Sequence, residues 1–496
     1  MLAWTIYLSF LGMAVLMCLP KDRPSLARWT ALGTALLGLG CGLIGALSFD
    51  SSAGVVPLID EPWVPALGIH YHLAVDGISL TMVLLTGLAA VVGILFSWNL
   101  EQSPKEFFAY YLALIGGCYG VFLSFDLLLL FVFYEIAIVP KYFLIARWGS
   151  TNREYGAMKL ALYSFASSAL VLVGVIAAYV ASGAQSFNLL ELSKYTFTAD
   201  QQAWLFPLVF AGFAVLAGMW PFHTWAPTGH VAAPTAASML LAGVVMKLGA
   251  YGCLRVAMTL FPAGLQQWSP FFGALAVTGI VYGALVALTQ KDFKFVIGYS
   301  SVSHMGFVLL GLVALSQTGL NGAVLQMFSH GVIAGLLFGV VGRMIYDRTH
   351  TRVLDELELM RLKKALPFAA IVFVIAGFAS MGMPGFSGFI AEVQVLIGAW
   401  QGFPAYALLA GIGVVLGVAY TLRAVQKAFY PNPADLAQVE LKEVKLPPVS
   451  LPEKLGAFTL LACTLIIGIY PRLLLDLIVP AFDSPLFEGL KKGVGQ

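Results

Sequence analysis

The sequence predicts an all-α polytopic membrane protein with about fourteen transmembrane helices. Of its 496 residues, 60% are hydrophobic and only 10% are charged, whereas soluble domains carry roughly 25% charged residues. Mean hydropathy is +0.89. Apolar runs of about 20 residues, the length that crosses a bilayer as a helix, recur along the whole chain. We therefore expect a single membrane domain over residues 1–496.

The predicted spans follow one another with short connections. The segment 2–20 is interpreted as the first span and not as a removed signal, because no basic region or convincing cleavage site accompanies it. Residues 49–77 form the longest predicted loop. The predicted spans are 2–20, 29–48, 78–98, 107–125, 126–146, 157–183, 203–222, 231–256, 269–290, 295–316, 319–345, 366–400, 404–426 and 455–479.

Predicted helices 7 and 12 are interrupted by glycine and proline. The stretch Leu216–Pro234 contains three prolines and two glycines, and Ser380–Glu392 contains the run Gly-Met-Pro-Gly. Such residues cannot all occupy one regular helix. Two breaks five helices apart favour a transporter built from inverted repeats, although ordinary proline kinks are the alternative. The division is then helices 1–3 (1–106), a first repeat of helices 4–8 (107–256), a second repeat of helices 9–13 (269–426) and helix 14 (455–479).

The basic residues predict the orientation in the membrane. Most of the 27 Lys and Arg residues lie in alternate loops, and positive charge marks the cytoplasmic side. Lys291, Lys294 and Lys442 are counted in these inner loops. Both termini are therefore predicted to be on the outer or periplasmic side of a multi-pass protein. The opposite loops hold only Lys194, Arg255, Arg472, Lys491 and Lys492.

Five ionisable residues lie inside predicted spans: Glu135, Lys247, His304, His330 and Glu392. A charge at bilayer depth costs at least a few kcal/mol, so such a group indicates a functional site. Histidine titrates near neutral pH and suits a proton wire, although helix–helix hydrogen bonding is an alternative role. A packing pair is the alternative for the glutamate of helix 5. The order acid, base, histidine, histidine, acid predicts a charge-coupled proton channel.

Three further residues are predicted to be auxiliary to this set. Lys141 follows Glu135 by about one and a half turns and either takes part or extends its ammonium to the membrane surface. His223 and His230 lie at the first helix break, where they either relay protons or satisfy freed backbone groups. Asp126 is expected to cap helix 5.

The sequence predicts no metal, cofactor or nucleic-acid site in this chain. The five cysteines are scattered singly through apolar segments, which supports neither a zinc nor an iron–sulfur centre. A net charge of +2 gives no basic surface for nucleic acid. The expected surroundings are a lipid bilayer, and the expected cargo is the proton.

Several motifs resemble a known family. The runs Tyr134–Pro140, Pro221–Trp225, Leu241–Gly252, Asp292–Gly306 and Gly382–Glu392 look like the antiporter-like proton-pumping membrane subunits of respiratory complex I. The resemblance covers about residues 75–475 and implies fourteen helices, two inverted five-helix repeats and broken helices 7 and 12. The chain is most similar to the M-type, because it ends soon after helix 14 and has glutamate at 392, where the L-type and N-type subunits have lysine.

The resemblance implies a proton-translocating membrane-arm subunit of an NAD(P)H:quinone oxidoreductase. Glu135 would modulate the site, Lys247 and the histidines would form the wire, and Glu392 would give the exit. NADH, FMN, iron–sulfur clusters and quinone are expected in partner subunits, with no cofactor in this chain. L-type and N-type subunits are the expected neighbours, in a bacterial inner membrane or a thylakoid.

One position departs from the family pattern. Family members carry a lysine in helix 7, five residues before the proline of the motif at Pro221, and this chain has Leu216 there. Glu135 therefore lacks its expected partner, and an unpaired buried charge is strongly destabilising. We expect Glu135 to be protonated at neutral pH or paired with another cation, for which Lys141 is the nearby candidate.

Three other functions remain open from the sequence. A subunit of a multisubunit cation/proton antiporter and the ion-pumping arm of a membrane-bound hydrogenase would share the same motifs. A structural spacer in the membrane arm is the third, because an impaired first half-channel would follow from Leu216.

Overall fold

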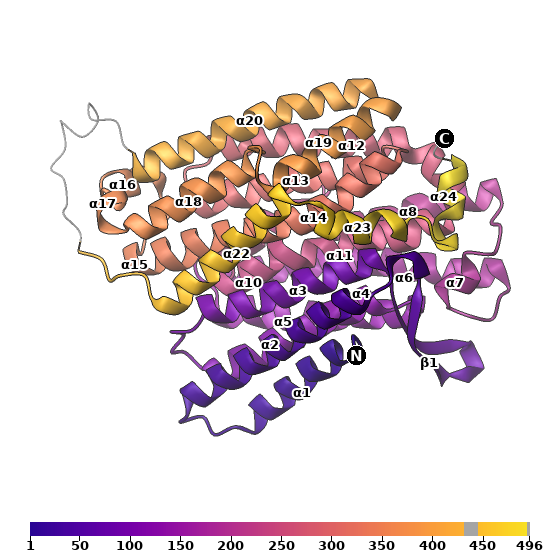
Figure 1. The fold of residues 1–496 in the computed structure, drawn as a ribbon, viewed down its shortest axis with the longest axis horizontal. Helices are drawn as coiled ribbons and strands as arrows, with labels where there is room; N and C mark the ends of the chain where they lie inside the picture. The colour runs from indigo at the N-terminus through magenta and orange to yellow at the C-terminus, as the bar shows by residue number, and fades with distance from the viewer. Residues whose placement is uncertain (431–444, 494–496) are drawn as a thin grey trace.

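The computed structural model describes residues 1–430 and 445–493 and consists mainly of long helices that lie side by side (Figure 1). Twelve helices of the described chain are long and apolar enough to cross a membrane. The shorter α1 and the broken pair α18/α19 complete the predicted fourteen. In order, the spans are α1 (Trp4–Cys18), α2 (Pro24–Ser48), α3 (Gly77–Phe96), α4 (Pro104–Leu123), α5 (Leu127–Trp148), α6 (Arg153–Ser182), α8 (Ala199–Ala217) with α9 (Trp225–Ala232), Thr235–Met258, α12 (Pro262–Thr289), α13 (Phe293–Val313), Gln317–Thr349, α18 (Pro367–Ser380) with α19 (Ser387–Gly402), α20 (Pro404–Phe429) and α22 (Leu451–Ile469).

Two of these spans are built from several helical segments. Thr235–Met258 comprises α10 (Thr235–Leu240), η3 (Leu241–Val245), α11 (Met246–Gly252) and η4 (Cys253–Met258), and Gln317–Thr349 comprises α14 (Gln317–Phe338), η5 (Gly339–Tyr346) and α15 (Asp347–Thr349). The segments η3, η4 and η5 are π-helical. Short elements connect or follow the spans: η1 (Ser51–Ala53), η2 (Pro65–Leu67), α7 (Leu189–Leu192), α16 (Leu354–Glu358), α17 (Leu362–Ala365), α23 (Arg472–Ala481), η6 (Pro485–Phe487) and α24 (Glu488–Gly493).

Aspartates begin several spans, as the capping preference of this residue requires. The Asp126 carboxylate accepts hydrogen bonds from the backbone N–H groups of Leu128 and Leu129, which confirms its predicted role at the start of α5. Asp76 caps α3 by accepting from Ser79 N–H, and Asp292 caps α13 in the same way. These caps satisfy donors that a helix start leaves unpaired.

Both predicted helix breaks are present. α8 ends at Ala217 and is followed by Gly218, which has φ +87°, and α9 begins only at Trp225. α18 ends at Ser380 and α19 begins at Ser387; between them Gly382 has φ +73° and Gly385 has φ +97°. Glycine adopts this left-handed region without steric cost, so the glycine positions set where each helix stops.

The structure differs from the predicted boundaries in three places. The predicted loop 49–77 contains an antiparallel hairpin, β1 (Val56–Val64) with β2 (Ile69–Val75). The second half of helix 7 lies at α9, beyond the predicted end of that helix. The span predicted at 455–479 ends at Ile469, and a separate α23 follows, because Pro471 has no N–H to continue the helical hydrogen bonds.

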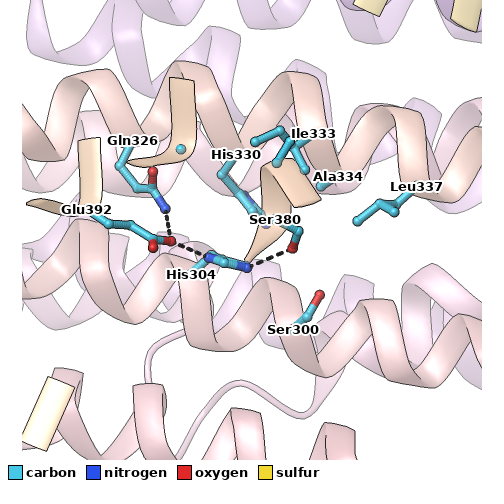
Figure 2. Close-up of a pocket in the computed structure, with 11 residues that line it drawn as sticks. Ser300, His304, Gln326, His330, Ile333, Ala334, Leu337, Ser380 and Glu392 are labelled. Atoms are coloured by element: carbon cyan, nitrogen blue, oxygen red, sulfur yellow. Dashed lines mark hydrogen bonds and ion pairs between the residues drawn. The ribbon is translucent and has the colours of Figure 1, made fainter. Parts of the chain in front are cut away.

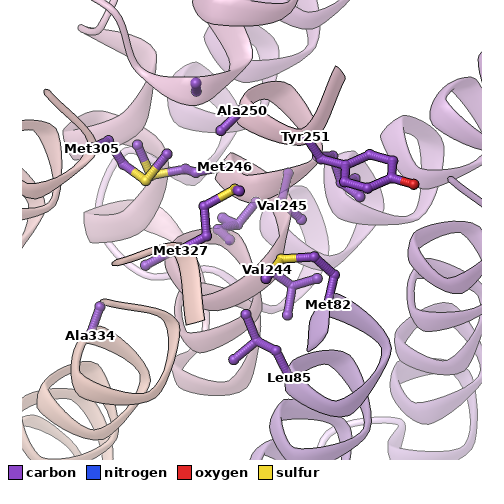
Figure 3. Packing of buried hydrophobic residues seen from close by; sticks show 14 of the residues in the cluster. Met82, Leu85, Val244, Val245, Met246, Ala250, Tyr251, Met305, Met327 and Ala334 are labelled. Carbon is purple, nitrogen blue, oxygen red and sulfur yellow. The ribbon is translucent and has the colours of Figure 1, made fainter. Parts of the chain in front are cut away.

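The central span Thr235–Met258 is surrounded by other helices and fully buried. Methionines from four spans, Met82, Met246, Met305 and Met327, pack beside Val244 and Val245 of this span (Figure 3). Methionine is unbranched and fills irregular gaps between helices. Lys247 thus follows directly on a residue of the apolar core.

The N-terminus and the last described helix lie at the same end of the helix layer (Figure 1), as expected if both termini are on one side of the membrane. Which side of the membrane this is stays a prediction. The N-terminus and α24 lie at the same end of the helix layer as the β1–β2 hairpin (Figure 1). Two basic residues counted in loops are instead fully buried: Arg255 is 0% exposed and Lys294 is 2% exposed. Lys442, counted on the inner side, lies outside the described residues.

Candidate functional site: a buried row of titratable side chains

The second helix break positions a carboxylate inside the protein. Glu392 lies in the second turn of α19, just after the break, and is 5% exposed. A Cβ on Gly382 would lie 3.0 Å from Glu392 Oε2, so the carboxylate reaches back to the broken segment. Glycine at 382 is required both by its positive φ and by this close approach.

His304 of α13 binds this carboxylate. Its Nδ1 lies 2.9 Å from Glu392 Oε1, and Gln326 Nε2 of α14 donates to the same oxygen at 3.1 Å (Figure 2). On the other side of the ring, Nε2 lies 3.2 Å from Ser380 Oγ and 3.4 Å from the Tyr420 hydroxyl. Hydroxyls both donate and accept, so this setting accommodates neutral and protonated imidazole alike.

His330 of α14 lies beside His304 and continues the row. The two ring centroids are 5.4 Å apart. A cavity of about 10 Å³ lies among His304, His330, Ser300 and Glu392, which is near the minimum volume for one water molecule. The two histidines are therefore close enough for proton transfer through a single water.

Lys247 completes the row on the far side of His330. Its Nζ lies 2.6 Å from His330 Nδ1 and also donates to the carbonyl of Ala242. The π-helical segments η3 and η4 lie on either side of α11, which carries Lys247. Such segments are frequent at functional sites. Lys247 has no carboxylate partner among the described residues, so His330 and a carbonyl provide its polar contacts.

The structure therefore brings together four of the five predicted site residues, in the order Lys247, His330, His304, Glu392. They come from α11, α14, α13 and α19, so their order in space differs from their order along the chain. Within the described residues, no group of three His, Cys, Asp or Glu side chains has the arrangement of a metal site. The row is a chain of proton donors and acceptors within a membrane-spanning part of the protein.

Glu135, the fifth residue, does not join this row. It is half-buried on α5, and its Oε1 has no hydrogen-bond partner among the described residues. Leu216 on α8 is 2% exposed. α8 contacts α5 through the Tyr134 and Phe213 rings, 5.7 Å apart, and contacts α11 at Gly249. α8 therefore contacts both the helix of Glu135 and the helix of Lys247, and it carries the apolar Leu216 where the family has a lysine.

Lys141 does not pair directly with Glu135 either. Its side chain is 1% exposed and donates to Ser164 Oγ at 3.1 Å. The interpretation that Lys141 extends to the membrane surface is therefore wrong, because α6 covers it. Lys141 and Glu135 still interact electrostatically, so Glu135 has a cation nearby without a direct ion pair.

The two histidines at the first break have different surroundings. His230 is fully buried, and it interacts electrostatically with both Lys247 and Lys294. His223 packs against the rings of Tyr282 and Tyr299 at 5.2 and 6.2 Å. The ring nitrogens of His230 have no hydrogen-bond partner within the described chain. The ring of His223 interacts with the backbone of Pro221 in the broken segment, as expected of a residue that satisfies freed backbone groups, and only His230 lies near the row.

Comparison with known proteins places the chain in a family. Residues 124–417 match the family described as "NADH:quinone oxidoreductase/Mrp antiporter, TM". The chain belongs to this family. It is 39% identical over 467 residues to NADH-quinone oxidoreductase subunit M of Rhodobacter capsulatus, covering 92% of this chain and 89% of that protein. It is 37% identical over 496 residues to subunit M of Escherichia coli strain K12, covering 96% of each.

Solved structures share the fold of this family member along its whole length. A chain in "Respiratory complex I from Thermus thermophilus with bound NADH" matches with a TM-score of 0.88 and 27% identity, covering 100% of both chains. A chain in the Mrp complex from Dietzia sp. matches with a TM-score of 0.85 and 21% identity, covering 100% of this chain and 99% of that one. The latter likeness concerns the fold alone. The predicted resemblance to M-type complex I subunits is confirmed.

Some site residues could not be recognised from the sequence. Gln326 precedes His330 by four residues and so shares its helix face, which is a usable signal. Tyr420 and Ser380 give no such signal, because single hydroxyl residues are common in membrane helices. Arg255 was counted as a loop residue, yet it forms a fully buried ion pair with Asp76, with Nη1 2.7 Å from Oδ2.

Proposed function

We propose that this chain is a proton-translocating membrane-arm subunit of a complex I-like NAD(P)H:quinone oxidoreductase. Quinone reduction takes place in other subunits, which bind NADH, FMN, iron–sulfur clusters and quinone, and this chain supplies the proton pathway. L-type and N-type subunits are its neighbours in the membrane. The names of the related subunit M proteins and the row Lys247–His330–His304–Glu392 support this assignment.

The row has the chemistry of a proton wire. A protonated Lys247 donates to His330 Nδ1 at 2.6 Å, and the imidazolium that forms faces His304. A proton on His304 is stabilised by Glu392 at 2.9 Å. Lys247, His330 and His304 each become neutral when they pass the proton on, and Glu392 returns to its carboxylate form when it releases the proton, so no charge accumulates along the row. Glu392, beside the helix break, is the group from which the proton leaves.

Electrostatic coupling makes the transfer responsive to neighbouring charges. Two unit charges 4 Å apart interact by about 4 kcal/mol at an effective dielectric constant near 20. A charge that appears or disappears at one member of the row therefore changes proton affinity at the next by several powers of ten. A conformational or charge change elsewhere in the complex can thus drive the proton in one direction.

The supporting experiment measures protons moved per electron. The complex that contains this chain would be reconstituted into liposomes with Glu392→Gln, which keeps the side-chain shape and removes the proton-accepting carboxylate. We expect a lower proton-to-electron ratio than in the wild type. Gln394→Ala on the same helix is the matched control and should leave the ratio unchanged. Equal ratios in Glu392→Gln and wild type would contradict the proposal.

A second function has one specific observation in its favour. Leu216 lies on the helix between Glu135 and α11, and Glu135 has no direct cation partner in the described chain. The first repeat would then serve as structure in the membrane arm while the second repeat conducts protons. Leu216→Lys distinguishes the two: a raised proton-to-electron ratio would show a first half-channel that lacks only this lysine. An unchanged ratio would favour the structural role.

A further inference from the structure

Gln326 is a neutral side chain beside the carboxylate at which the row ends. It lies on α14, is 2% exposed, and donates from Nε2 to Glu392 Oε1 at 3.1 Å (Figure 2). His304 Nδ1 lies 2.9 Å from the same oxygen. This carboxylate oxygen therefore has two neighbours. One is a ring that titrates, and the other is an amide that carries both a donor and an acceptor without titrating.

The acceptor end of this amide is unpaired. Gln326 Oε1 is buried and has no hydrogen-bond partner within the described residues. A buried acceptor without a donor costs free energy, and each such group in a folded protein calls for an explanation. Because no hydrogen bond from the described chain holds this end, the amide is free to turn about its Cγ–Cδ bond. The oxygen and the NH2 group have nearly the same shape, so the turn needs little extra space.

The two orientations of the amide fit two protonation states of Glu392. A carboxylate only accepts hydrogen bonds, so it binds the NH2 group of Gln326, as in the structure. A protonated carboxyl group has an O–H that donates, so it binds the amide oxygen instead. The present distance between Nε2 and Glu392 Oε1 is 3.1 Å, and O–H···O hydrogen bonds measure about 2.5–3.0 Å. Turning the amide therefore brings its oxygen almost within hydrogen-bond range.

We propose that Gln326 is a positioning residue that draws the proton on Glu392 away from His304. This inference rests on the proposed function and deepens it. The imidazolium of His304 gives its Nδ1 proton to Glu392 Oε1, which breaks the N–H bond, forms an O–H bond and leaves both groups neutral. The amide then turns, and Gln326 Oε1 accepts the new O–H.

The turn of the amide gives the transfer a direction. Without it, the new O–H faces the Nδ1 atom that has just lost the proton, 2.9 Å away, and the proton returns. With it, the O–H is held by Gln326, while the Nε2–H that remains on His304 donates to Ser380 Oγ, 3.2 Å away. When Glu392 releases its proton, the carboxylate attracts the NH2 group again and the amide turns back.

The decisive variant is Gln326→Met in the assembled complex, reconstituted into liposomes. Methionine has a similar length but lacks both the N–H donor and the carbonyl acceptor. A hydrogen bond to a charged group changes an equilibrium by about tenfold or more. We therefore expect coupled turnover to fall by about tenfold, and the proton-to-electron ratio to fall as well. If this variant fails to assemble, Gln326→Asn tests the same contact, because its amide is one methylene too short to reach Glu392.

Gln317→Met is the matched control. Gln317 begins the same helix, and its Nε2 donates to Asn321 Oδ1 at 3.2 Å, so the same change removes an amide that does not touch the row. This variant should pump like the wild type.

Infrared spectroscopy of the same complexes distinguishes positioning from a structural contact. The carbonyl band of protonated Glu392 is identified by its loss in Glu392→Gln. In Gln326→Met this band should move to higher frequency, because the carboxyl group loses its hydrogen-bond partner. A lowered ratio with an unshifted band would show that Gln326 only supports the packing, and would overturn the inference.

The remaining outcomes separate this inference from the proposed function. A normal ratio in Gln326→Met together with a lowered ratio in Glu392→Gln would overturn the role of Gln326 and leave the proton-translocating function intact. A normal ratio in both variants would overturn the inference and the proposed function together.

Discussion

The buried ion pair between Asp76 and Arg255 predicts a large, conditional stability effect. The guanidinium contacts both carboxylate oxygens at 2.7 Å, and both side chains are 0% exposed. Arg255 also donates to the Tyr251 hydroxyl at 3.1 Å and lies 4.9 Å from the centre of the Phe125 ring. The pair joins the start of α3 to η4, which closes the end of the molecule on the hairpin side.

Removing one partner leaves the other charge buried and unpaired. Arg255→Met should therefore destabilise the protein by about 3–5 kcal/mol, and Asp76→Asn by a similar amount, although asparagine still caps α3. The double variant Asp76→Asn/Arg255→Met leaves no uncompensated charge. Replacing both members of a buried pair is often neutral or stabilising, so we expect it to recover most of the loss.

The assay is denaturation of the detergent-solubilised protein, followed by intrinsic tryptophan fluorescence in the wild type, both single variants and the double variant. Strong positive coupling in this double-mutant cycle is the predicted result. A double variant as unstable as the two single effects added together would refute the reasoning, because the two charges would then act independently.

Three further predictions concern the break, the first repeat and a surface contact. Gly382→Ala should lower pumping, because a φ of +73° strains an L-residue by about 1–2 kcal/mol and the new methyl group crowds Glu392. The measurement is the proton-to-electron ratio, and Gly411→Ala is the control because a Cβ there meets open space. Lys141→Met should assemble normally and pump like the wild type if the first repeat is structural, and proteoliposome acidification measures this. Lys427 donates to Asp355 in α16 and lowers the pKa of that carboxyl. The contact should therefore stabilise α16 above about pH 4, and this stabilisation should be lost as the pH falls through the lowered pKa. Hydrogen exchange of Leu354–Glu358 measures it, and Asp355→Asn should abolish the pH dependence.

The residues of the buried row were predictable from the sequence, because a charged or titratable residue stands out within an apolar helix. Lys247, His304, His330 and Glu392 each interrupt an apolar run, and the structure places them in one row. Their spatial order was not predictable, since only the packing of the helices places His330 of α14, and not His304 of α13, against Lys247. The two helix breaks were predicted from their prolines and glycines, and the structure shows positive φ at Gly218, Gly382 and Gly385.

Other features depend on contacts that a linear pattern does not contain. Arg255 and Lys294 were counted in loops because each lies close to the end of an apolar run, yet neighbouring helices bury both. Lys141 lies close enough to the end of its helix for its ammonium to reach the membrane surface. Only the packing of α6 over this side chain shows that it does not. The β1–β2 hairpin carried one usable signal, because Ile69, Tyr71 and Leu73 alternate with histidines in β2, whereas β1 contains two prolines and no such alternation.

The most direct test of the central claim is the proton-to-electron ratio of the reconstituted complex with His330→Leu. His330 is the link between Lys247 at 2.6 Å and His304 at a centroid distance of 5.4 Å, and leucine fills the space without accepting a proton. The account predicts a lower ratio with assembly and artificial-acceptor electron transfer preserved. A ratio equal to that of the wild type in a fully assembled complex would contradict it, because protons would then cross without using the row.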